Sequence, residues 1–460
     1  MTDFIKQAAN VVPSKKQLDW FELEQYAFIH FGVNTYTNRE WGDGSEPESI
    51  FNPVKLDCDQ WVDAIKSAGL KGMVLTAKHH DGFCLWPSAY TEHSVKNSPI
   101  KTDIVKEASD ACRRGGIKFG FYLSPWDMNS KLYGTDEYND YFCNQLTELL
   151  TGYGEIFHVW FDNACGEGPD GIKQEYDFER YFKLINKYQP NATIYNDFGP
   201  DIRWCGNEAG TGRSSEWSVV PQELCKFAKE QTGKGPLADE TDLSYLFNTN
   251  EQLGSLYQII CSKGLVFVPS EIDTSVRKGW FWHPDEEPKK IEELFKIYLS
   301  SVGNNACLHL NIPPNRDGLI DEKDVIRLKE YGDFLKTSFS NPIKYKMEIS
   351  AYNSELQPEY VLTLDVPLSK IKYVVLSEDI SKGQRIEEFM IYTNHNGGTA
   401  FPLYKGGTVG YKKICCITDP FSDQNPLLGR DGDTNEMRIK ITSSRDKVIL
   451  KDIKVYGDMS

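Results

Sequence analysis

Residues 56–80, LDCDQWVDAIKSAGLKGMVLTAKHH, join a helical pattern directly to a strand pattern. The first part repeats apolar side chains at helical spacing, namely Trp61, Val62, Ile65 and Leu70. The second part, from Gly72 onward, is a short apolar run typical of a strand that is buried on both faces. A helix followed at once by such a strand predicts parallel strands covered by helices.

The same alternation extends outward over about residues 27–315. Strands are predicted at 27–32, 118–125, 155–162, 192–199, 264–271 and 306–314, and helices at 104–116, 136–150, 176–189 and 289–303. An open doubly wound sheet and a closed barrel both fit this order. No G-x-G-x-x-G follows the first strand, which weakens the dinucleotide-binding version, and roughly 290 residues suit a barrel with insertions. We therefore predict an α/β fold with a (β/α)8-like (TIM) barrel in residues 1–340.

The pattern changes after a helix predicted at about 321–338. Residues 341–460 contain short β-rich runs, such as YVLTLDVP and IKYVVLSE, separated by Asn, Gly, Asp and Ser. This pattern predicts a C-terminal antiparallel β-sandwich domain. All ten tryptophans lie at or before Trp282, so we expect this domain to serve packing rather than sugar binding.

The charge and hydropathy of the chain exclude several partners. The formal net charge of −16 argues against nucleic acid and anionic membrane surfaces, because both attract cationic proteins. No run approaches ~18 consecutive apolar residues, so no membrane-spanning helix is expected. The sequence gives no indication of the oligomeric state.

The N-terminus and the cysteines favour a cytoplasmic location. The first residues, MTDFIKQ, lack the basic and apolar regions of a secretory signal. The eleven cysteines are scattered without a C-x-x-C pair, which is typical of free thiols rather than disulfides or a zinc ribbon. A periplasmic or secreted location would require that a signal had been removed.

Polar and aromatic side chains follow the predicted strands at their C-terminal ends: His30, His79, His80, Tyr122, Trp126, Trp160, Asp162, Asn196 and Asp197. Taken singly, a strand histidine is more often structural, and an aspartate after a strand often caps the next helix. Together they predict an active site at the end of a barrel. Histidine, tyrosine and carboxylate groups bind sugar hydroxyls, and tryptophan packs on the apolar face of a pyranose.

A metal site is a competing use of the segment His79-His80-Asp81. Adjacent strand residues point to opposite faces, so one ion would not easily bind both histidines. We therefore expect no metal and no other cofactor. A non-catalytic carbohydrate-binding protein and a metal-dependent sugar isomerase stay open as alternative functions.

These residues resemble glycoside hydrolase family 29, the α-L-fucosidases, across almost the whole barrel. The matching segments are FIHFGVNTY (28–36) with Glu40-Trp41, TAKHHDGFCLW (76–86), FGFYLSPWD (119–127), VWFDNACG (159–166) and VPSEIDTSVRKGWFWH (268–283). The resemblance implies a (β/α)8-like barrel followed by a β-sandwich. It also implies a retaining exo-α-L-fucosidase that acts on fucosylated oligosaccharides or glycoconjugates.

The resemblance also implies roles for single residues. Asp162 matches the nucleophile that forms the fucosyl-enzyme. Contacts with the substrate are expected from His30, Glu40, Trp41, His79, His80, Trp86, Tyr122, Trp160 and Trp282.

The acid/base is expected in RWCGNEAG (203–210). This segment resembles the W-x-G-N-E element of the subfamily that cleaves α-1,3- and α-1,4-linked fucose, which makes Glu208 the acid/base. Glu216, Asp197 and Glu271 are its rivals. Retaining hydrolysis needs two carboxyl groups about 5–5.5 Å apart, and we expect Asp162 and Glu208 to follow the fourth and fifth strands.

Overall fold

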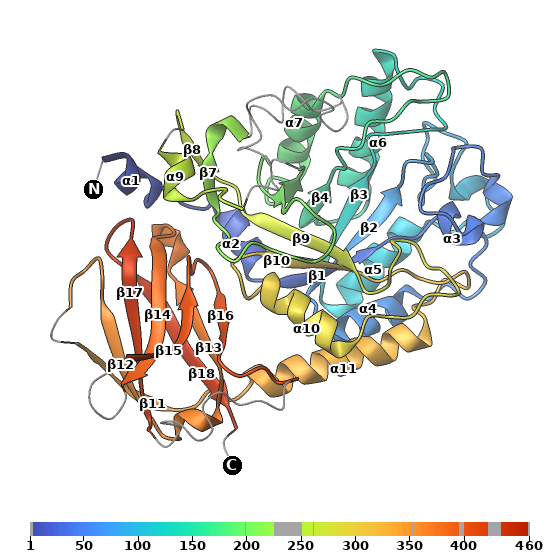
Figure 1. The fold of residues 1–460 in the computed structure, drawn as a ribbon. Helices are drawn as coiled ribbons and strands as arrows, with labels where there is room; N and C mark the ends of the chain where they lie inside the picture. Colours follow the sequence, from blue (N-terminus) through green and yellow to red (C-terminus); the bar gives the residue numbers. More distant parts are fainter. Residues whose placement is uncertain are drawn as a thin grey trace.

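The computed structural model describes residues 3–197, 199–224, 251–260, 262–350, 353–394, 400–421 and 434–458. Two parts follow each other along the chain, a parallel barrel with helices around it and a C-terminal pair of antiparallel sheets (Figure 1). Helix α11 (Glu322–Phe339) connects them, and the first strand of the second part begins at Tyr345.

Eight strands form the barrel sheet in the order β5-β4-β3-β2-β1-β10-β9-β6, and all neighbouring pairs are parallel. Their bounds are β1 (Gln25–Ile29), β2 (Gly72–Lys78), β3 (Lys118–Leu123), β4 (His158–Trp160), β5 (Thr193–Tyr195), β6 (Arg203–Trp204), β9 (Ser270–Ser275) and β10 (Cys307–Asn311). A parallel bridge between Tyr195 and Ile202 joins the two edges, so the barrel is nearly closed. The predicted fold class is thereby confirmed.

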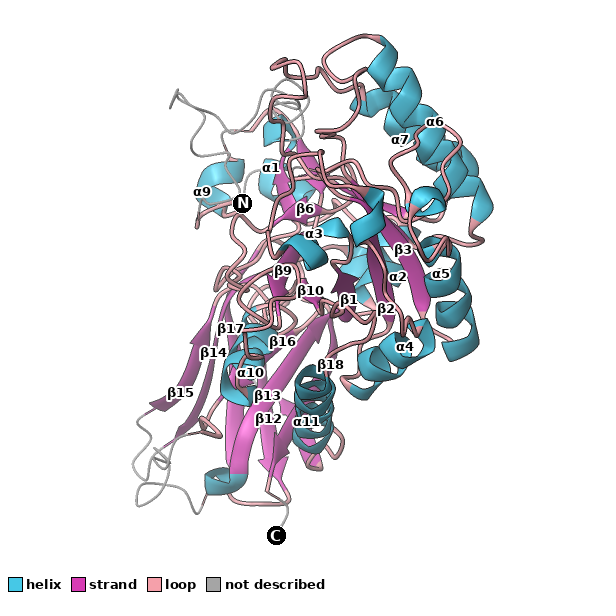
Figure 2. Cartoon of the chain, turned by 90° about the vertical axis from the view of Figure 1, so that its right-hand side faces the viewer, coloured by secondary structure: helices cyan, strands magenta, loops and turns pink. Residues whose placement is uncertain are grey.

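Helices pack on the outside of the barrel (Figure 2). The longer ones are α2 (Lys15–Phe21), α4 (Cys58–Ser67), α5 (Ile104–Gly115), α6 (Glu137–Gly152), α7 (Phe178–Tyr188), α10 (Ile291–Ser300) and α11. Shorter ones are α1 (Asp3–Ala8), α3 (Val33–Thr37), α9 (Leu256–Ile259) and the 3-10 turns η1 (Glu48–Ile50), η2 (Val95–Asn97), η4 (Leu368–Lys370) and η5 (Ile380–Lys382). Four helices begin at an aspartate whose carboxylate accepts a backbone N–H, namely Asp57, Asp103, Asp177 and Asp321.

Two barrel strands differ from the prediction. The apolar run at 264–271 splits into β8 (Leu265–Phe267), which pairs antiparallel with β7 (Val219–Pro221), and the first residues of β9. Pro269 lies between β8 and β9, and a proline has no N–H to continue a ladder. The predicted bounds of this strand are therefore wrong. Strand β6 was not predicted, because two residues are too few to show an alternation.

The C-terminal part is a β-sandwich, as predicted. A five-stranded sheet, β11-β12-β17-β14-β15, faces a three-stranded sheet, β16-β13-β18. The bounds are β11 (Tyr345–Ile349), β12 (Glu359–Leu364), β13 (Ile371–Glu378), β14 (Ile386–Asn394), β15 (Ala400–Gly406), β16 (Lys413–Cys416), β17 (Glu436–Ser444) and β18 (Leu450–Gly457). Leu362 and Phe389 of the larger sheet and Val374 and Val455 of the smaller one share a single buried core.

The described residues also bear on two expectations for the whole chain. None of their helices is long and apolar enough to cross a membrane. Their cysteines form no disulfide. Cys225 and Cys261 lie outside the described residues.

A buried ion pair connects the ends of β2 and β3. Lys78 Nζ lies 2.9 Å from Asp127 Oδ2, and both side chains are buried. Lys78 Nζ also donates to Gln145 Oε1 at 3.1 Å, and Asp127 Oδ1 accepts the N–H groups of Asn129 and Ser130 at 3.0 and 2.8 Å. This network fixes the loop after β3 against the histidines that follow β2.

Replacing Lys78 with methionine would leave the Asp127 carboxylate buried without its cation. We expect the free energy of unfolding of the barrel to fall by about 3–5 kcal/mol, measured by urea denaturation. Lys15→Met is a matched control, because Lys15 and Asp19 form an exposed pair worth about 0.3–0.5 kcal/mol. Equal stability of the two variants would contradict this account.

Candidate active site

A pocket of about 220 Å³ opens at the C-terminal ends of the barrel strands, where (β/α)8 enzymes build their active sites. The predicted residues that line it are His30, Trp41, His79, His80, Tyr122, Trp160, Asp162 and Glu208. Residues that were not predicted also line it, namely Phe28, Ala164, Asp273 and Trp280. One pocket thus brings together both carboxyl groups expected to carry the chemistry.

Asp162 lies in a loop two residues after β4, among hydrogen-bond donors. Its Oδ2 accepts the Tyr122 hydroxyl proton at 3.1 Å, and its Oδ1 accepts the Ala164 N–H at 2.8 Å. His80 Nε2 lies 3.6 Å from Oδ2, beyond hydrogen-bond distance, and is not one of these donors. Asp162 does not cap the next helix, because Asp177 caps α7. The carboxylate is therefore oriented, supplied with donors and open to the pocket.

His30 and His80 are neutral groups that can accept hydrogen bonds. His30 Nδ1 lies 2.8 Å from Asn311 Oδ1, whose own amide nitrogen donates elsewhere, so Nδ1 carries the proton. His80 Nδ1 lies 2.7 Å from Ser124 Oγ, which donates its proton to a backbone carbonyl. Burial lowers the pKa of both histidines, that of His30 to about 3. Each ring keeps an unprotonated Nε2 that can accept a hydroxyl proton.

His79 and His80 do not face opposite ways, so the prediction from strand alternation is wrong. Strand β2 ends at Lys78, so strand alternation does not extend to the two histidines. Both rings line the pocket, with centroids 4.2 Å apart. In the described part of the chain, no group of three or more His, Cys, Asp or Glu side chains could hold a metal ion.

Glu208 lies at the rim of the pocket in the loop after β6, not after β5 as predicted. Its Oε2 accepts the Trp280 indole N–H at 3.2 Å. The side chain is exposed, yet the protein atoms around it and the charge of Asp162 raise its pKa, against the opposing effect of the Trp280 hydrogen bond. A raised pKa suits a carboxyl group that must hold a proton.

The rivals of Glu208 do not line the pocket. Glu216 is buried beside Arg203 and Arg213, and these guanidinium groups hold its pKa below the usual range although burial alone would raise it. Glu271 is fully buried below the pocket. Asp197, which follows β5, is raised in pKa to about 8 by burial and then by the charge of Asp162.

Two predicted tryptophans lie elsewhere. Trp86 is buried in the loop after β2, where its indole N–H donates to Glu148 Oε2 at 2.8 Å. Trp282 lies near the Arg277 guanidinium, 5.9 Å from its ring centroid. The expectation that these two residues contact the substrate is not supported by their positions.

Glu40 acts on the pocket indirectly, through the loop after β9. The tryptophan of that loop that lines the pocket is Trp280. Glu40 Oε2 accepts the backbone N–H of Trp280 at 2.8 Å, and its Oε1 contacts His283 Nε2. Glu40 thus braces the loop after β9 rather than lining the pocket. Residues 280–283 are all aromatic, so the sequence offered no basis for choosing Trp280 over Trp282.

Two of the missed residues lie on barrel strands, and the sequence held a signal for the first of them. Phe28 lies on β1, two residues before His30, which follows the strand, and both side chains line the pocket. Asp273 lies on β9, and its Oδ1 accepts the Trp204 indole N–H at 2.9 Å. The wrong bounds for this strand concealed Asp273.

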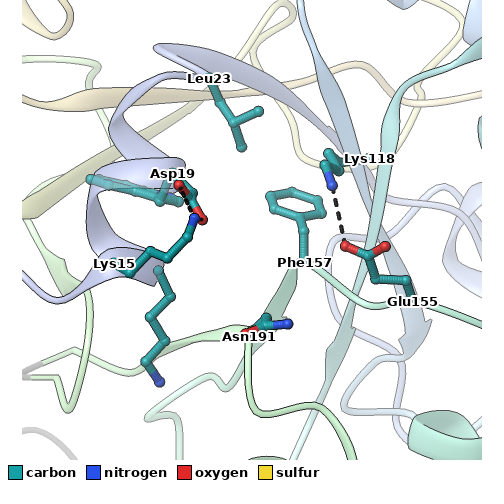
Figure 3. Close-up of a pocket in the computed structure, with 9 residues that line it drawn as sticks. Lys15, Asp19, Leu23, Lys118, Glu155, Phe157 and Asn191 are labelled. Carbon is teal, nitrogen blue, oxygen red and sulfur yellow. Dashed lines mark hydrogen bonds and ion pairs between the residues drawn. The ribbon is translucent and has the colours of Figure 1, made fainter.

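A second hollow, of about 170 Å³, lies at the opposite end of the barrel, where β3 and β4 begin (Figure 3). Its charged groups form ion pairs: Lys15 with Asp19 at 2.5 Å, Lys118 with Glu155 at 3.2 Å, and Lys16 with Asp201, outside the hollow, at 2.5 Å. Phe157 lies between the first two pairs. We assign the chemistry to the other end, where the histidines and Asp162 lie.

Known proteins resemble this chain over most of its length. A sequence model of the α-L-fucosidases matches residues 4–338. Alpha-L-fucosidase 1 of Arabidopsis thaliana is 39% identical over 434 residues, which are 88% of this chain and 81% of that protein. A solved glycoside hydrolase 29 family member from an unknown rumen bacterium has a TM-score of 0.82 at 34% identity, covering 98% of this chain and 78% of that one. A Ruminococcus gnavus GH29 fucosidase in complex with fucose has a TM-score of 0.79 at 28% identity, covering 98% and 96%.

The raised pKa of Asp197 predicts a pH dependence of stability. The folded protein keeps the proton up to about pH 8, whereas the unfolded chain releases it near pH 4. The stabilisation from this group is thus complete below about pH 4 and is lost as the pH rises toward 8. We expect Asp197→Asn to flatten the fall in unfolding free energy over this range, by at most about 1.4 kcal/mol per pH unit, in urea titrations at stepped pH. Parallel slopes for the variant and the parent would contradict this.

Proposed function

The chain belongs to the α-L-fucosidase family, glycoside hydrolase family 29, and from this premise we propose that it is a retaining exo-enzyme. It is a glycoside hydrolase that releases fucose. The proposed substrates are oligosaccharides or glycoconjugates with terminal α-1,3- or α-1,4-linked L-fucose. The observation that carries the proposal is that Asp162 and Glu208 line one pocket in contrasting surroundings.

In the first proposed step, an Asp162 oxygen attacks the anomeric carbon while the bond to the leaving oxygen breaks. The Tyr122 hydroxyl and the Ala164 N–H orient this carboxylate for the attack. Glu208 gives its proton to the leaving oxygen, for which its raised pKa prepares it. The product of this step is a β-linked fucosyl-enzyme.

In the second proposed step, Glu208 removes a proton from water as the water oxygen attacks the anomeric carbon. The bond to Asp162 breaks, and the carboxylate is regenerated. Two inversions in sequence retain the α configuration of the released fucose. The position of Glu208 at the rim supports this role, because water and the leaving group must both reach it.

The pocket also suits the recognition of one neutral sugar. The Nε2 atoms of His30 and His80 can accept hydroxyl protons, and the rings of Trp41, Trp160 and Trp280 can pack on apolar sugar faces. A non-catalytic sugar-binding protein would use the same walls without needing a pair of carboxyl groups. A metal-dependent isomerase would lose activity in EDTA, whereas we expect hydrolysis to survive it.

Azide rescue of two variants tests the proposed roles. Asp162→Gly should lose at least about 10³-fold in kcat because no nucleophile remains, and azide entering its place should give β-fucosyl azide. Glu208→Ala should lose about 10²–10⁴-fold, and azide attacking the fucosyl-enzyme should give α-fucosyl azide. NMR assigns the anomers, and the same anomer from both variants would contradict the two roles.

The linkage preference is tested by comparing substrates of equal length. We expect kcat/KM for branched α-1,3- and α-1,4-fucosides to exceed that for an α-1,2-fucoside by about tenfold or more, because rim contacts discriminate between aglycones. An aryl fucoside reports on the fucose site alone. Equal values for all three substrates would contradict the proposed linkage while leaving the fucosidase activity intact.

A further inference from the structure

Glu271 is a buried carboxyl group that the two-step reaction does not use. It lies on β9 two residues before Asp273, so both side chains point into the barrel, and Asp273 lines the pocket while Glu271 does not. Its side chain is fully buried. Glu271 therefore belongs to the layer of side chains directly beneath the fucose pocket.

Hydrogen-bond donors surround this carboxyl group. Its Oε1 accepts the Trp160 indole N–H at 2.8 Å and lies 3.0 Å from His309 Nδ1. Its Oε2 accepts the Tyr26 hydroxyl proton, and that hydroxyl in turn accepts the Trp20 indole N–H at 2.9 Å. In the described part of the chain, no lysine or arginine forms an ion pair with Glu271.

The fourth neighbour reveals the protonation state. His158 Nδ1 lies 2.7 Å from Thr193 Oγ1, and this hydroxyl donates its own proton to the Phe157 carbonyl at 3.2 Å, so Nδ1 carries the histidine proton. The unprotonated Nε2 lies 3.3 Å from Glu271 Oε2 and is otherwise buried without a partner among the described residues, so the only proton that could reach it is one on Oε2. A carboxylate would turn lone pairs toward this nitrogen, whereas a carboxylic acid would donate to it.

We infer that Glu271 is a neutral positioning acid, with its proton on Oε2 donated to His158 Nε2, and that it sets the floor of the fucose pocket. One carboxyl group then satisfies four partners without a counter-charge. Burial raises the pKa of Glu271 well above its usual value and lowers the pKa of His158 and His309, in agreement with this assignment.

The influence of Glu271 reaches the sugar through two rings that line the pocket. Trp160, held through its indole N–H, stacks on Tyr195 with centroids 4.1 Å apart. His309, beside Oε1, stacks on Phe28 with centroids also 4.1 Å apart. Both Trp160 and Phe28 line the pocket. The inference rests on this pocket receiving fucose, and it is independent of the linkage and of the role of Glu208.

The first test compares Glu271→Gln with Glu271→Leu in the full chain. The glutamine amide keeps an acceptor for Trp160 and His309 and a donor for His158, whereas leucine keeps none. We expect Glu271→Gln to stay within about fivefold of the parent kcat/KM, because it loses the single acceptor of Tyr26. Glu271→Leu should raise KM for an aryl fucoside about tenfold or more, with a smaller change in kcat, because a displaced floor weakens sugar binding in general. Equal losses in both variants, or no loss in Glu271→Leu, would overturn the inference.

The second test is infrared difference spectroscopy, parent minus Glu271→Gln, near neutral pH. The expected spectrum contains the C=O band of a protonated carboxyl group, and carboxylate bands in its place would overturn the neutral state. This measurement needs no activity, so it is decisive even where the proposed mechanism fails. Should Glu271→Leu not fold, Glu271→Met is the unbranched replacement.

Glu378→Gln is the matched control. Glu378 is also a buried carboxyl group, but it lies in the sandwich and accepts the backbone N–H groups of Arg385, Ile386 and Gly410 at 2.8, 3.0 and 2.7 Å. We expect its replacement to lower the melting temperature and leave KM unchanged. A rise in KM equal to that of Glu271→Leu would overturn the inference, since destabilisation alone would then explain both.

Discussion

Burial opposes the ionisation of a carboxyl group, and near the pocket the partners of each carboxyl group decide how far this effect is offset. Burial raises the pKa of Asp273 well above its usual range and that of Asp197 to about 8. Glu216 is also buried, but its ion pairs with two buried arginines hold its pKa low. Among the described residues, no arginine or lysine forms an ion pair with Asp162, which accepts a hydroxyl proton and a backbone N–H instead. Such partners orient an anion without neutralising it, and a nucleophile needs that combination.

Burial of the pocket histidines also makes the pocket suitable for a neutral sugar. Its histidines are uncharged, so their ring nitrogens can accept hydroxyl protons. The layer beneath is similar, since the Glu271 carboxyl group and the His158 and His309 rings form a polar network that includes no lysine or arginine of the described residues. The described residues that line the pocket include no lysine or arginine, so they offer little to an anionic ligand. Hydrogen-bond geometry and stacking must therefore provide the specificity.

Much of the barrel could be predicted from the sequence, and so could those site residues that lie at or just after the ends of strands. Parallel strands all end on one side, so His30, Tyr122 and Asp162 had to converge wherever the strands were correctly placed. The errors have local causes. Pro269 split an apolar run into two strands of different sheets, and β6 was too short to leave a pattern. The choice between two nearby tryptophans depended on the course of a loop, which periodicity does not describe.

The two catalytic carboxyl groups of the proposed mechanism are held by different kinds of structure, and their different roles in the reaction explain why. Asp162 lies close to the end of β4 and meets the same anomeric carbon in every turnover, so a rigid strand end suits it. Glu208 lies on a loop, where the Trp280 indole holds it and Glu40 in turn holds the Trp280 backbone. It must meet leaving groups of different shape and then water. A carboxyl group held at an exposed rim by the Trp280 indole can do both. Because loops hold it there, strand patterns in the sequence do not predict its position.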